Sequence, residues 1–204
     1  MTTFFTADYH LGHANICLYA HRAFYTSEDV VNDEWISREA AHTVSQAMNA
    51  EIVHRHNAVV GKHDTVYFLG DLAFGRNTVP WALDNLNGNF KFVIGNHDKQ
   101  LTQFLSTHTD TRWEILPAET EIDLFGHHIV LGHYRMCCWN RMHYGSWHLH
   151  GHSHDAGSNR CINKKSMDVG IDVSQRVLGE YRPFRFDELE GEMIKKTFVP
   201  TEAL

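Results

Sequence analysis

The sequence lacks a surplus of positive charge. Its 18 lysines and arginines face 25 acidic residues, which gives a formal net charge of −7. A surface that neutralises a long nucleic-acid backbone needs clustered basic residues. The composition therefore disfavours long nucleic acid as a partner, whereas a small phosphorylated substrate is compatible with it.

The sequence also lacks paired cysteines and a membrane signal. None of its four cysteines, Cys17, Cys137, Cys138 and Cys161, has C-x-x-C spacing, and adjacent cysteines are unsuited to an ordinary disulfide. We expect reduced thiols, as in cytoplasmic proteins. No basic leader or long apolar run precedes the first predicted strand, so we expect no signal peptide, no membrane span and a cytoplasmic location.

Two familiar motifs are incomplete. Gly61-Lys62 resembles the tail of a phosphate-binding loop, but the upstream glycine is missing and His63 stands where the motif needs serine or threonine. The serine-hydrolase pattern G-x-S-x-G fails around Ser153, because Asp155 replaces its last glycine and no helix is predicted next. These absences argue against a P-loop protein and against serine catalysis.

Histidine, in contrast, is abundant. The chain has 17 histidines in 204 residues, about four times an average share. Histidine is the commonest metal ligand and titrates near neutral pH, so the excess favours metal or acid–base chemistry. We expect the histidines that do not end a predicted strand to lie on the surface, namely His42, His54, His56, His63 and His108.

The length and a hydrophobic content of 43% fit a single domain over residues 1–204. Apolar runs predict strands at 3–7, 65–69, 90–94, 121–125, 128–131, 147–150 and 166–173. Helical spacing predicts one long helix or two over 28–57, short helices at 79–86 and 99–108, and a closing helix at 186–194. The central strand, helix and strand form a βαβ unit, and the fold class is therefore α/β.

Metal-binding residue types follow several of these strands. The stretch Gly95-Asn96-His97-Asp98 ends one strand, and the other strand ends carry Asp8, His10, Asp71, His133, His152 and His154. Strand alternation would put Asp8 and His10 on one side, and likewise His152 and His154. Open α/β sheets bind ligands at the carboxyl edge of their strands, so we expect these side chains to converge there.

Oxygen and nitrogen donors without thiolates suit Mn²⁺, Fe, Zn²⁺ or Ni²⁺ better than Ca²⁺. The set is too large for one tetrahedral zinc ion. Two ions that share a bridging carboxylate would use seven ligands, and such pairs serve in-line displacement at phosphorus by a metal-bound hydroxide.

The ordered blocks resemble the calcineurin-like metallophosphoesterase superfamily: Asp8/His10, Gly70-Asp71, Gly95-Asn96-His97-Asp98, Gly132-His133 and Gly151-His152-Ser153-His154. The resemblance implies a four-layer α-β-β-α sandwich of two mixed sheets with helices outside. It also implies that Asp8, His10 and His154 hold one metal ion, that Asn96, His133 and His152 hold a second, and that Asp71 bridges them. His97 would contact the phosphoryl oxygen or protonate the leaving group, and Asp98 would orient its imidazole.

The stretches 8–16 and 148–152 are similar to a small single-domain branch of that superfamily from bacteria and phages. That branch often has proline where Ala23 and Arg135 stand, and residues 28–45 read as a helical insertion. Aromatic and basic residues near the predicted site are candidates for substrate contact, namely His13, Arg22, Tyr134, Arg135, Trp139 and Arg141.

The sequence thus predicts a dinuclear metal-dependent phosphoester hydrolase, with Mn²⁺ favoured and Fe, Zn²⁺ or Ni²⁺ as alternatives. A nucleotide or another small phosphodiester is preferred, because no arginine cluster awaits a dianionic monoester. The alternatives are a phosphomonoesterase, or a metal-binding protein-interaction scaffold without turnover. A di-iron redox enzyme is disfavoured because Glu-x-x-His pairs are absent. The sequence does not indicate an oligomeric state.

Overall fold

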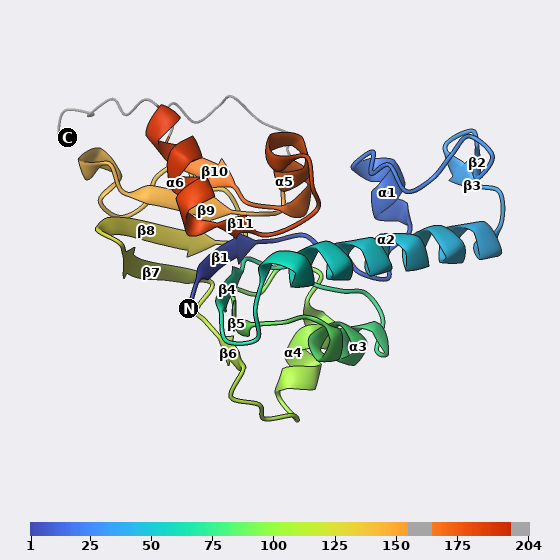
Figure 1. The fold of residues 1–204 in the computed structure, drawn as a ribbon, viewed down its shortest axis with the longest axis horizontal. Coiled ribbons are helices and arrows are strands. Elements are labelled where there is room, and N and C mark those ends of the chain that lie inside the picture. The colour runs from blue at the N-terminus through green and yellow to red at the C-terminus, as the bar shows by residue number, and fades with distance from the viewer. Residues whose placement is uncertain (155–164, 197–204) are drawn as a thin grey trace.

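The computed structural model describes residues 1–154 and 165–196, in which two main sheets are flanked by helices (Figure 1). In chain order the elements are β1 (Thr3–Thr6), α1 (Asn15–Tyr19), β2 (Val30–Val31), β3 (Glu34–Trp35), α2 (Arg38–Val59), β4 (Thr65–Phe68), α3 (Thr78–Asn85), β5 (Asn89–Phe92), α4 (Lys99–Leu105), β6 (Trp113–Ile115), β7 (Glu119–Leu124), β8 (His127–Gly132), η1 (Met142–Tyr144), β9 (Trp147–His150), β10 (Ser166–Asp168), α5 (Ile171–Leu178), β11 (Phe184–Arg185) and α6 (Phe186–Lys195).

The first sheet has the order β11-β1-β4-β5-β6. β1, β4, β5 and β6 run parallel, whereas β11 is antiparallel to β1. α3 connects β4 to the parallel β5, which confirms the predicted βαβ unit. In β4 the side chains of Val66 and Phe68 are buried and alternate with half-buried neighbours, as the period of two in a strand requires.

The second sheet has the order β10-β9-β8-β7. β7 and β8 form the predicted antiparallel hairpin, and β8, β9 and β10 run parallel. Both sheets are therefore mixed, and in each the parallel strands bring their carboxyl ends to one edge.

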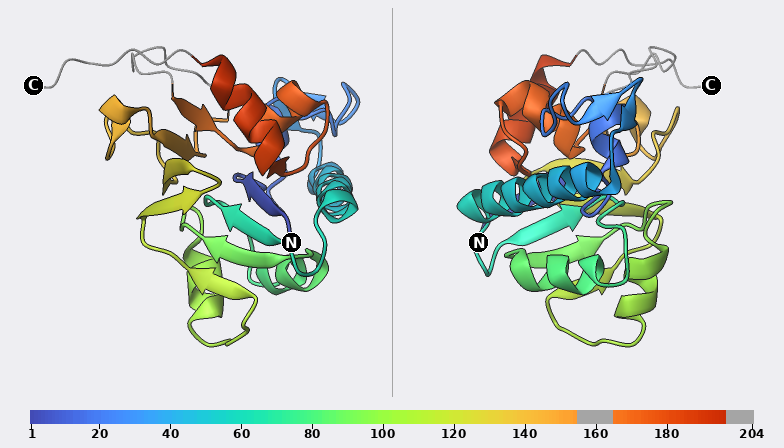
Figure 2. Two further views of the ribbon diagram at one scale, coloured as in Figure 1. Left: turned by 60° about the vertical axis from the view of Figure 1, so that its left-hand side comes forward. Right: turned by 90° about the vertical axis from the view of Figure 1, so that its right-hand side faces the viewer.

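Two apolar cores hold these layers together. Phe4, Val66 and Phe90 lie in the first core, with side chains from α2, α3 and α4. The adjacent Phe5 points the other way, into a second core with Leu131 and Leu149 of the second sheet and with side chains of α5 and α6. The inner faces of the two sheets thus share one core, and the views in Figure 2 show the helices α2, α3 and α4 beside the first sheet.

The predicted helix over 28–57 is correct only from Arg38 onward. Residues 28–37, the start of the predicted helical insertion, instead contain the hairpin β2–β3, which lies over the amino-terminal end of α2 (Figure 1). Asn32 and Asp33 both have positive φ, of 53° and 62°, as a tight two-residue hairpin turn demands. Ser37 then caps the amino terminus of α2, and its Oγ accepts a hydrogen bond from the Ala40 N–H at 3.1 Å.

The predicted strand over 166–173 is also too long. β10 ends at Asp168, whose Oδ1 accepts a hydrogen bond from the Gly170 N–H at 2.7 Å. This turn ends the strand, and α5 begins at Ile171. The change of direction brings the first turn of α5 against the loop that follows β1, since the Ile171 N–H donates to the carbonyl of Ala7.

Four of the five histidines predicted on the surface are exposed, but His56 is fully buried. Its Nδ1 lies 2.7 Å from the hydroxyl of Tyr9 and its Nε2 lies 2.8 Å from the carbonyl of Asn87. Burial lowers the pKa of His56 to about 4. The prediction of a surface position for His56 is wrong because α2 packs this side chain against the first core.

Among the described residues, no helix combines the length and the apolar character that a membrane crossing requires. Cys17 is buried in the first core. Cys161, one of the four predicted thiols, and Asp155, which breaks the G-x-S-x-G pattern, lie outside the described residues.

Candidate metal centre

Acidic and imidazole side chains from both sheets meet at the carboxyl ends of the parallel strands. Asp8 and His10 follow β1, Asp71 follows β4 and Asn96 follows β5. From the second sheet, His133 follows β8, and His152 and His154 follow β9. The seven positions predicted as metal ligands are therefore brought to one region of the molecule.

These side chains form two groups with metal-ligand spacing. Within each group, one potential ligand atom from every residue lies within 4.8 Å of the others; the groups are Asp8, His10 and His154, and Asp71, His133 and His152. Asp71 lies between them, because its Oδ2 is 3.6 Å from Nε2 of His10 and 3.5 Å from Nε2 of His133. Asn96 adjoins the second group, with its Oδ1 2.8 Å from the same His133 nitrogen.

The chemistry of the first group fits a cation. Oδ1 of Asp8 and both ring nitrogens of His10 are buried and have no hydrogen-bond partner. Burial raises the pKa of Asp8 well above its usual value, and the nearby Asp168 and Asp71 add to the shift. Burial likewise lowers the pKa of His10 well below its usual value. A divalent ion would occupy the orphaned lone pairs. Its charge would favour the carboxylate of Asp8, against the effect of burial, and the neutral imidazole of His10, which burial already favours.

The backbone of these residues is unusual. Five of the seven have positive φ: Asp8 (59°), His10 (50°), Asp71 (63°), His152 (68°) and His154 (43°). Non-glycine residues seldom adopt this conformation, and when they do the strain often marks a functional site. The prediction from strand alternation is correct for Asp8 and His10, which share a group, and wrong for His152 and His154. The strands end before these residues. Left-handed turns aim the side chains instead, and they send His152 and His154 into different groups.

Two glycines allow the strands to approach closely. A Cβ on Gly95 would lie 2.3 Å from Oδ1 of Asp71 and 2.7 Å from the Asp71 backbone nitrogen. A Cβ on Gly70, where φ is +99°, would lie 2.3 Å from Nδ1 of His133. Only glycine leaves room for Asp71 and His133 at these positions.

His97, the predicted acid or phosphoryl contact, is exposed beside the two groups. Its ring centroid lies 5.6 Å from that of His10 and 4.9 Å from that of Phe74. Its backbone N–H donates to Oδ1 of Asp71 at 2.8 Å. The imidazole is thus placed next to the candidate centre, outside the two metal-spaced groups.

Asp98 does not have the predicted partner. Its carboxylate is fully buried and accepts hydrogen bonds from three backbone N–H groups: Asp71 at 2.7 Å, Leu72 at 2.9 Å and Gly95 at 2.9 Å. Burial raises the pKa of Asp98, although these hydrogen bonds oppose the shift. Asp98 holds the turn that carries Asp71, and its carboxylate is taken up by these backbone amides and has no hydrogen bond to the His97 imidazole, both residues being among those described.

The predicted substrate contacts fall into different places. His13 is at the site: its half-buried ring stacks on Phe74 with centroids 4.2 Å apart. Arg135 lines a cavity of about 260 Å³ together with His150 and Ser153. Tyr134 is 53% exposed, and its ring centroid lies 4.7 Å from that of His152.

The other three residues predicted as substrate contacts are either buried or lie at a separate cavity. Arg22 is only 1% exposed and pairs with Asp172. The Trp139 indole is buried and donates to Ser146. Arg141 lines a separate surface cavity together with His127, which begins β8. His133 follows the other end of that strand. At 3.3 Å per residue, His127 and His133 are roughly 20 Å apart.

Sequence reasoning missed two residues at the centre. The ring of Phe74 packs against His10, His13 and His97. Asp172 accepts a hydrogen bond from the His154 ring, with Oδ2 2.7 Å from Nδ1. No sequence signal identified Asp172, because it lies in a segment predicted as a strand, whereas Phe74 follows Asp71 closely enough that the glycine-turned loop could have suggested it.

Comparisons with known proteins give relatives along most of the chain. No protein-family model matches the sequence. An uncharacterised protein of Methanocaldococcus jannaschii is 29% identical over 188 residues, which cover 89% of this chain and 85% of that protein. The gene 66 proteins of Mycobacterium phages L5 and D29 are each 24% identical; the matches cover 86% and 83% of this chain, and 89% and 87% of the phage proteins.

A crystal structure of a protein of unknown function from Aquifex aeolicus is similar to this fold, with a TM-score of 0.62 and 20% sequence identity. The superposition covers 94% of this chain and 98% of that chain. At this identity the likeness shows a shared fold alone.

Proposed function

We propose that the protein is a dinuclear metal-dependent phosphoester hydrolase of the calcineurin-like metallophosphoesterase type. The observation that carries the proposal is the position of Asp71 Oδ2, at 3.6 and 3.5 Å from an imidazole nitrogen of each of two His/Asp groups. Paired metal sites that share a carboxylate are the usual means of displacement at phosphorus. The packed sheets with their flanking helices support assignment of the four-layer α-β-β-α sandwich of that superfamily.

In this proposal Asp8, His10 and His154 would hold one ion, Asn96, His133 and His152 would hold the other, and Asp71 would serve both. Two bound ions, with Mn²⁺ favoured, would supply a hydroxide nucleophile at neutral pH and positive charge opposite the phosphoryl oxygens. The chain itself has to keep the ligands apart from bulk water, and the burial of Asp8, His10, Asp71 and His133 does this.

His97 handles the proton of the leaving group. Its imidazole is exposed to substrate yet packed on Phe74, which limits its orientations. His97 is also tied to the centre through its backbone N–H, which holds Oδ1 of Asp71. The protonated imidazole donates to the departing oxygen, a role that typically contributes 10²- to 10⁴-fold to the rate.

The substrate is a small phosphodiester such as a nucleotide. Arg22 forms a buried ion pair with Asp172, and Arg141 lines a cavity away from the candidate centre. Among the described residues, the arginines predicted as substrate contacts therefore form no cluster at the centre that would match the second charge of a monoester.

The proposal is tested with the purified protein loaded with Mn²⁺. Metal content is counted by inductively coupled plasma mass spectrometry, and turnover of bis-p-nitrophenyl phosphate is compared with that of p-nitrophenyl phosphate before and after EDTA treatment. We expect two ions per chain and faster cleavage of the diester, with both lost to EDTA. A larger monoesterase rate would assign a phosphomonoesterase, and a protein that binds two ions without either activity would act as a metal-binding scaffold.

A further inference from the structure

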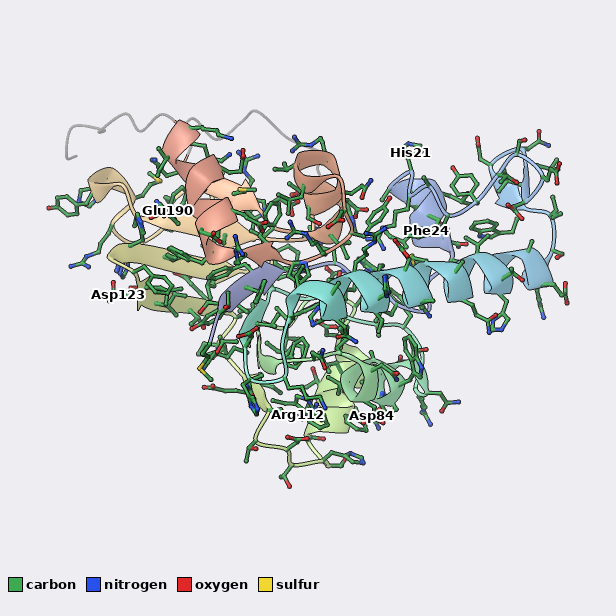
Figure 3. All side chains as sticks on the ribbon, in the orientation of Figure 1. His21, Phe24, Asp84, Arg112, Asp123 and Glu190 are labelled. Atoms are coloured by element: carbon green, nitrogen blue, oxygen red, sulfur yellow. The ribbon has the colours of Figure 1, made fainter. Side chains whose placement is uncertain are left out.

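A buried arginine lies beneath the first group of candidate ligands. Arg22 belongs to the segment after α1, where Figure 3 labels its neighbour Phe24. Its guanidinium reaches two backbone carbonyls at the end of β1: Nη2 donates to the Asp8 oxygen at 2.6 Å and Nη1 donates to the Tyr9 oxygen at 2.8 Å. Arg22 thereby holds the strained turn that presents Asp8.

The same guanidinium pairs with a carboxylate that lies 150 positions away in the sequence. Nε of Arg22 donates to Oδ1 of Asp172 at 2.7 Å, and Nη2 donates to Oδ2 at 2.9 Å. The two side chains are 0% and 8% exposed. Both carboxylate oxygens thus accept from a guanidinium that is always charged, in the bidentate geometry that an ionised carboxylate favours. Asp172 is therefore an ionised hydrogen-bond acceptor.

An ionised acceptor determines which nitrogen of His154 carries the proton. Oδ2 of Asp172 lies 2.7 Å from Nδ1 of His154, so Nδ1 must be the donor. The lone pair is then on Nε2, the other ring nitrogen. Carboxylate–histidine pairs of this kind orient a metal-binding imidazole and raise its basicity.

The second group has no such pair among the described residues. Nδ1 of His133 lies 2.7 Å from the backbone carbonyl of Leu69, which is neutral. The support of the two candidate ion positions is thus chemically different: a charged side-chain network serves one, and a main-chain carbonyl serves the other.

We propose that Arg22 and Asp172 are positioning residues for one ion position only, that of Asp8, His10 and His154. The inference rests on the proposed function for the existence of two ions. Arg22 fixes the Asp8 turn, Asp172 fixes the tautomer and direction of His154, and their mutual neutralisation lets both be buried.

The test is Asp172→Asn. The side-chain amide keeps the size of the carboxylate but cannot accept from both Arg22 and His154 with its two ends. We expect the affinity for one of the two ions to fall by about 10- to 100-fold, with the affinity for the other unchanged. Ions retained per chain are counted across a buffered Mn²⁺ series, and the spectrum of a spin-coupled Mn²⁺ pair should give way to that of a single ion.

The matched control is Asp187→Asn, which makes the same change at an exposed position of α6, where Asp187 pairs with Arg185. This variant should retain both ions. If Asp172→Asn binds both ions as tightly as the unchanged protein, or loses both together, the inference is overturned while the proposed function stands. If the unchanged protein binds no ions, the proposed function fails first.

A second measurement does not require Asp172→Asn to fold. Nitrogen-15 NMR of the unchanged, Zn²⁺-loaded protein reports the two ring nitrogens of His154, with His154→Gln used to assign the signals. We expect a protonated Nδ1 and an Nε2 signal shifted by the metal. The opposite tautomer would contradict the role of Asp172.

Discussion

The two His/Asp groups hold similar ligands by different means. In the first group, long-range side chains do the work: Asp172 holds the His154 ring, and Arg22 holds the Asp8 backbone. In the second group, each contact involves the main chain: the Leu69 carbonyl meets the His133 ring, and the Asp98 carboxylate accepts from the backbone N–H groups of Asp71 and Leu72.

Both kinds of support join distant parts of the chain, because Leu69 and His133 are 64 positions apart and Asp71 and Asp98 are 27 positions apart. They differ in what supplies the contact to the ligand imidazole. A backbone carbonyl is present whatever residue stands at position 69, whereas the contact to His154 requires a carboxylate at Asp172 and a guanidinium at Arg22 to neutralise it. The imidazole support of the first group therefore depends on two further side chains, and that of His133 depends on the backbone.

Asp71→Ala should break the comparison completely, because Asp71 is the residue that both groups share. We expect loss of both ions and of phosphodiester turnover, measured by elemental analysis and by cleavage of bis-p-nitrophenyl phosphate. Asp84→Ala on the exposed face of α3, labelled in Figure 3, is the control and should retain both. A full pair of ions in Asp71→Ala would show that the two groups do not share a bridge.

His97→Ala should leave both groups intact and still slow the reaction. Because the imidazole lies beside the groups and not in them, we expect two ions per chain with kcat lower by about 10²- to 10⁴-fold. His108→Ala, at an exposed histidine after α4, should have unchanged kcat. Metal loss that parallels the loss of activity would mean that His97 is a ligand.

Gly95→Ala should disturb both groups through the residue that they share. The new methyl group would collide with Asp71, and we expect about 1–3 kcal/mol of destabilisation together with weaker binding of both ions. Gly191→Ala in α6 meets no atom within 4 Å and should instead stabilise by about 0.5–1 kcal/mol. Urea unfolding compares the two variants, and equal free energies of unfolding would refute the close approach.

His56 is a buried histidine that belongs to neither group, and it can therefore be compared with the histidines of both. Its pKa is about 4 in the folded protein and about 6.5 in the unfolded chain, so the unfolded chain binds the proton more tightly. Its contribution to stability is present above pH 6.5 and is lost as the pH falls toward 4, by up to about 1.4 kcal/mol per pH unit. His56→Phe should remove this part of the slope in urea unfolding at pH 4.5 to 7, whereas His54→Phe, at an exposed position of α2, should not.

Much of the fold could be predicted because its signals are local. Apolar runs identified the strands β1, β4, β5, β8 and β9, and the polar residues after them identified the edge where they converge. The hairpin β2–β3 escaped prediction because Asn32 and Asp33 form a left-handed turn, whereas the apolar residues around them also fit helical spacing.

The candidate site was predicted only in part, because the sequence signals that identify it are local. Which residues gather at the edge follows from strand order, but which contacts they make there follows from tertiary packing. Asp98 binds backbone amides and not His97, and Arg22 turns inward to a partner 150 residues away. Neither contact leaves a periodic or spacing signal in the sequence.

The left-handed conformation of Asp8, His10, Asp71, His152 and His154 also limits how this centre could be redesigned. Asparagine, aspartate, histidine and glycine tolerate positive φ, whereas valine, isoleucine and threonine are strongly destabilised by steric clashes in that conformation. A mutant library meant to change metal preference should therefore draw on those four amino acids at these positions. The positive φ of these positions disfavours β-branched residues there, whichever metal ion is bound.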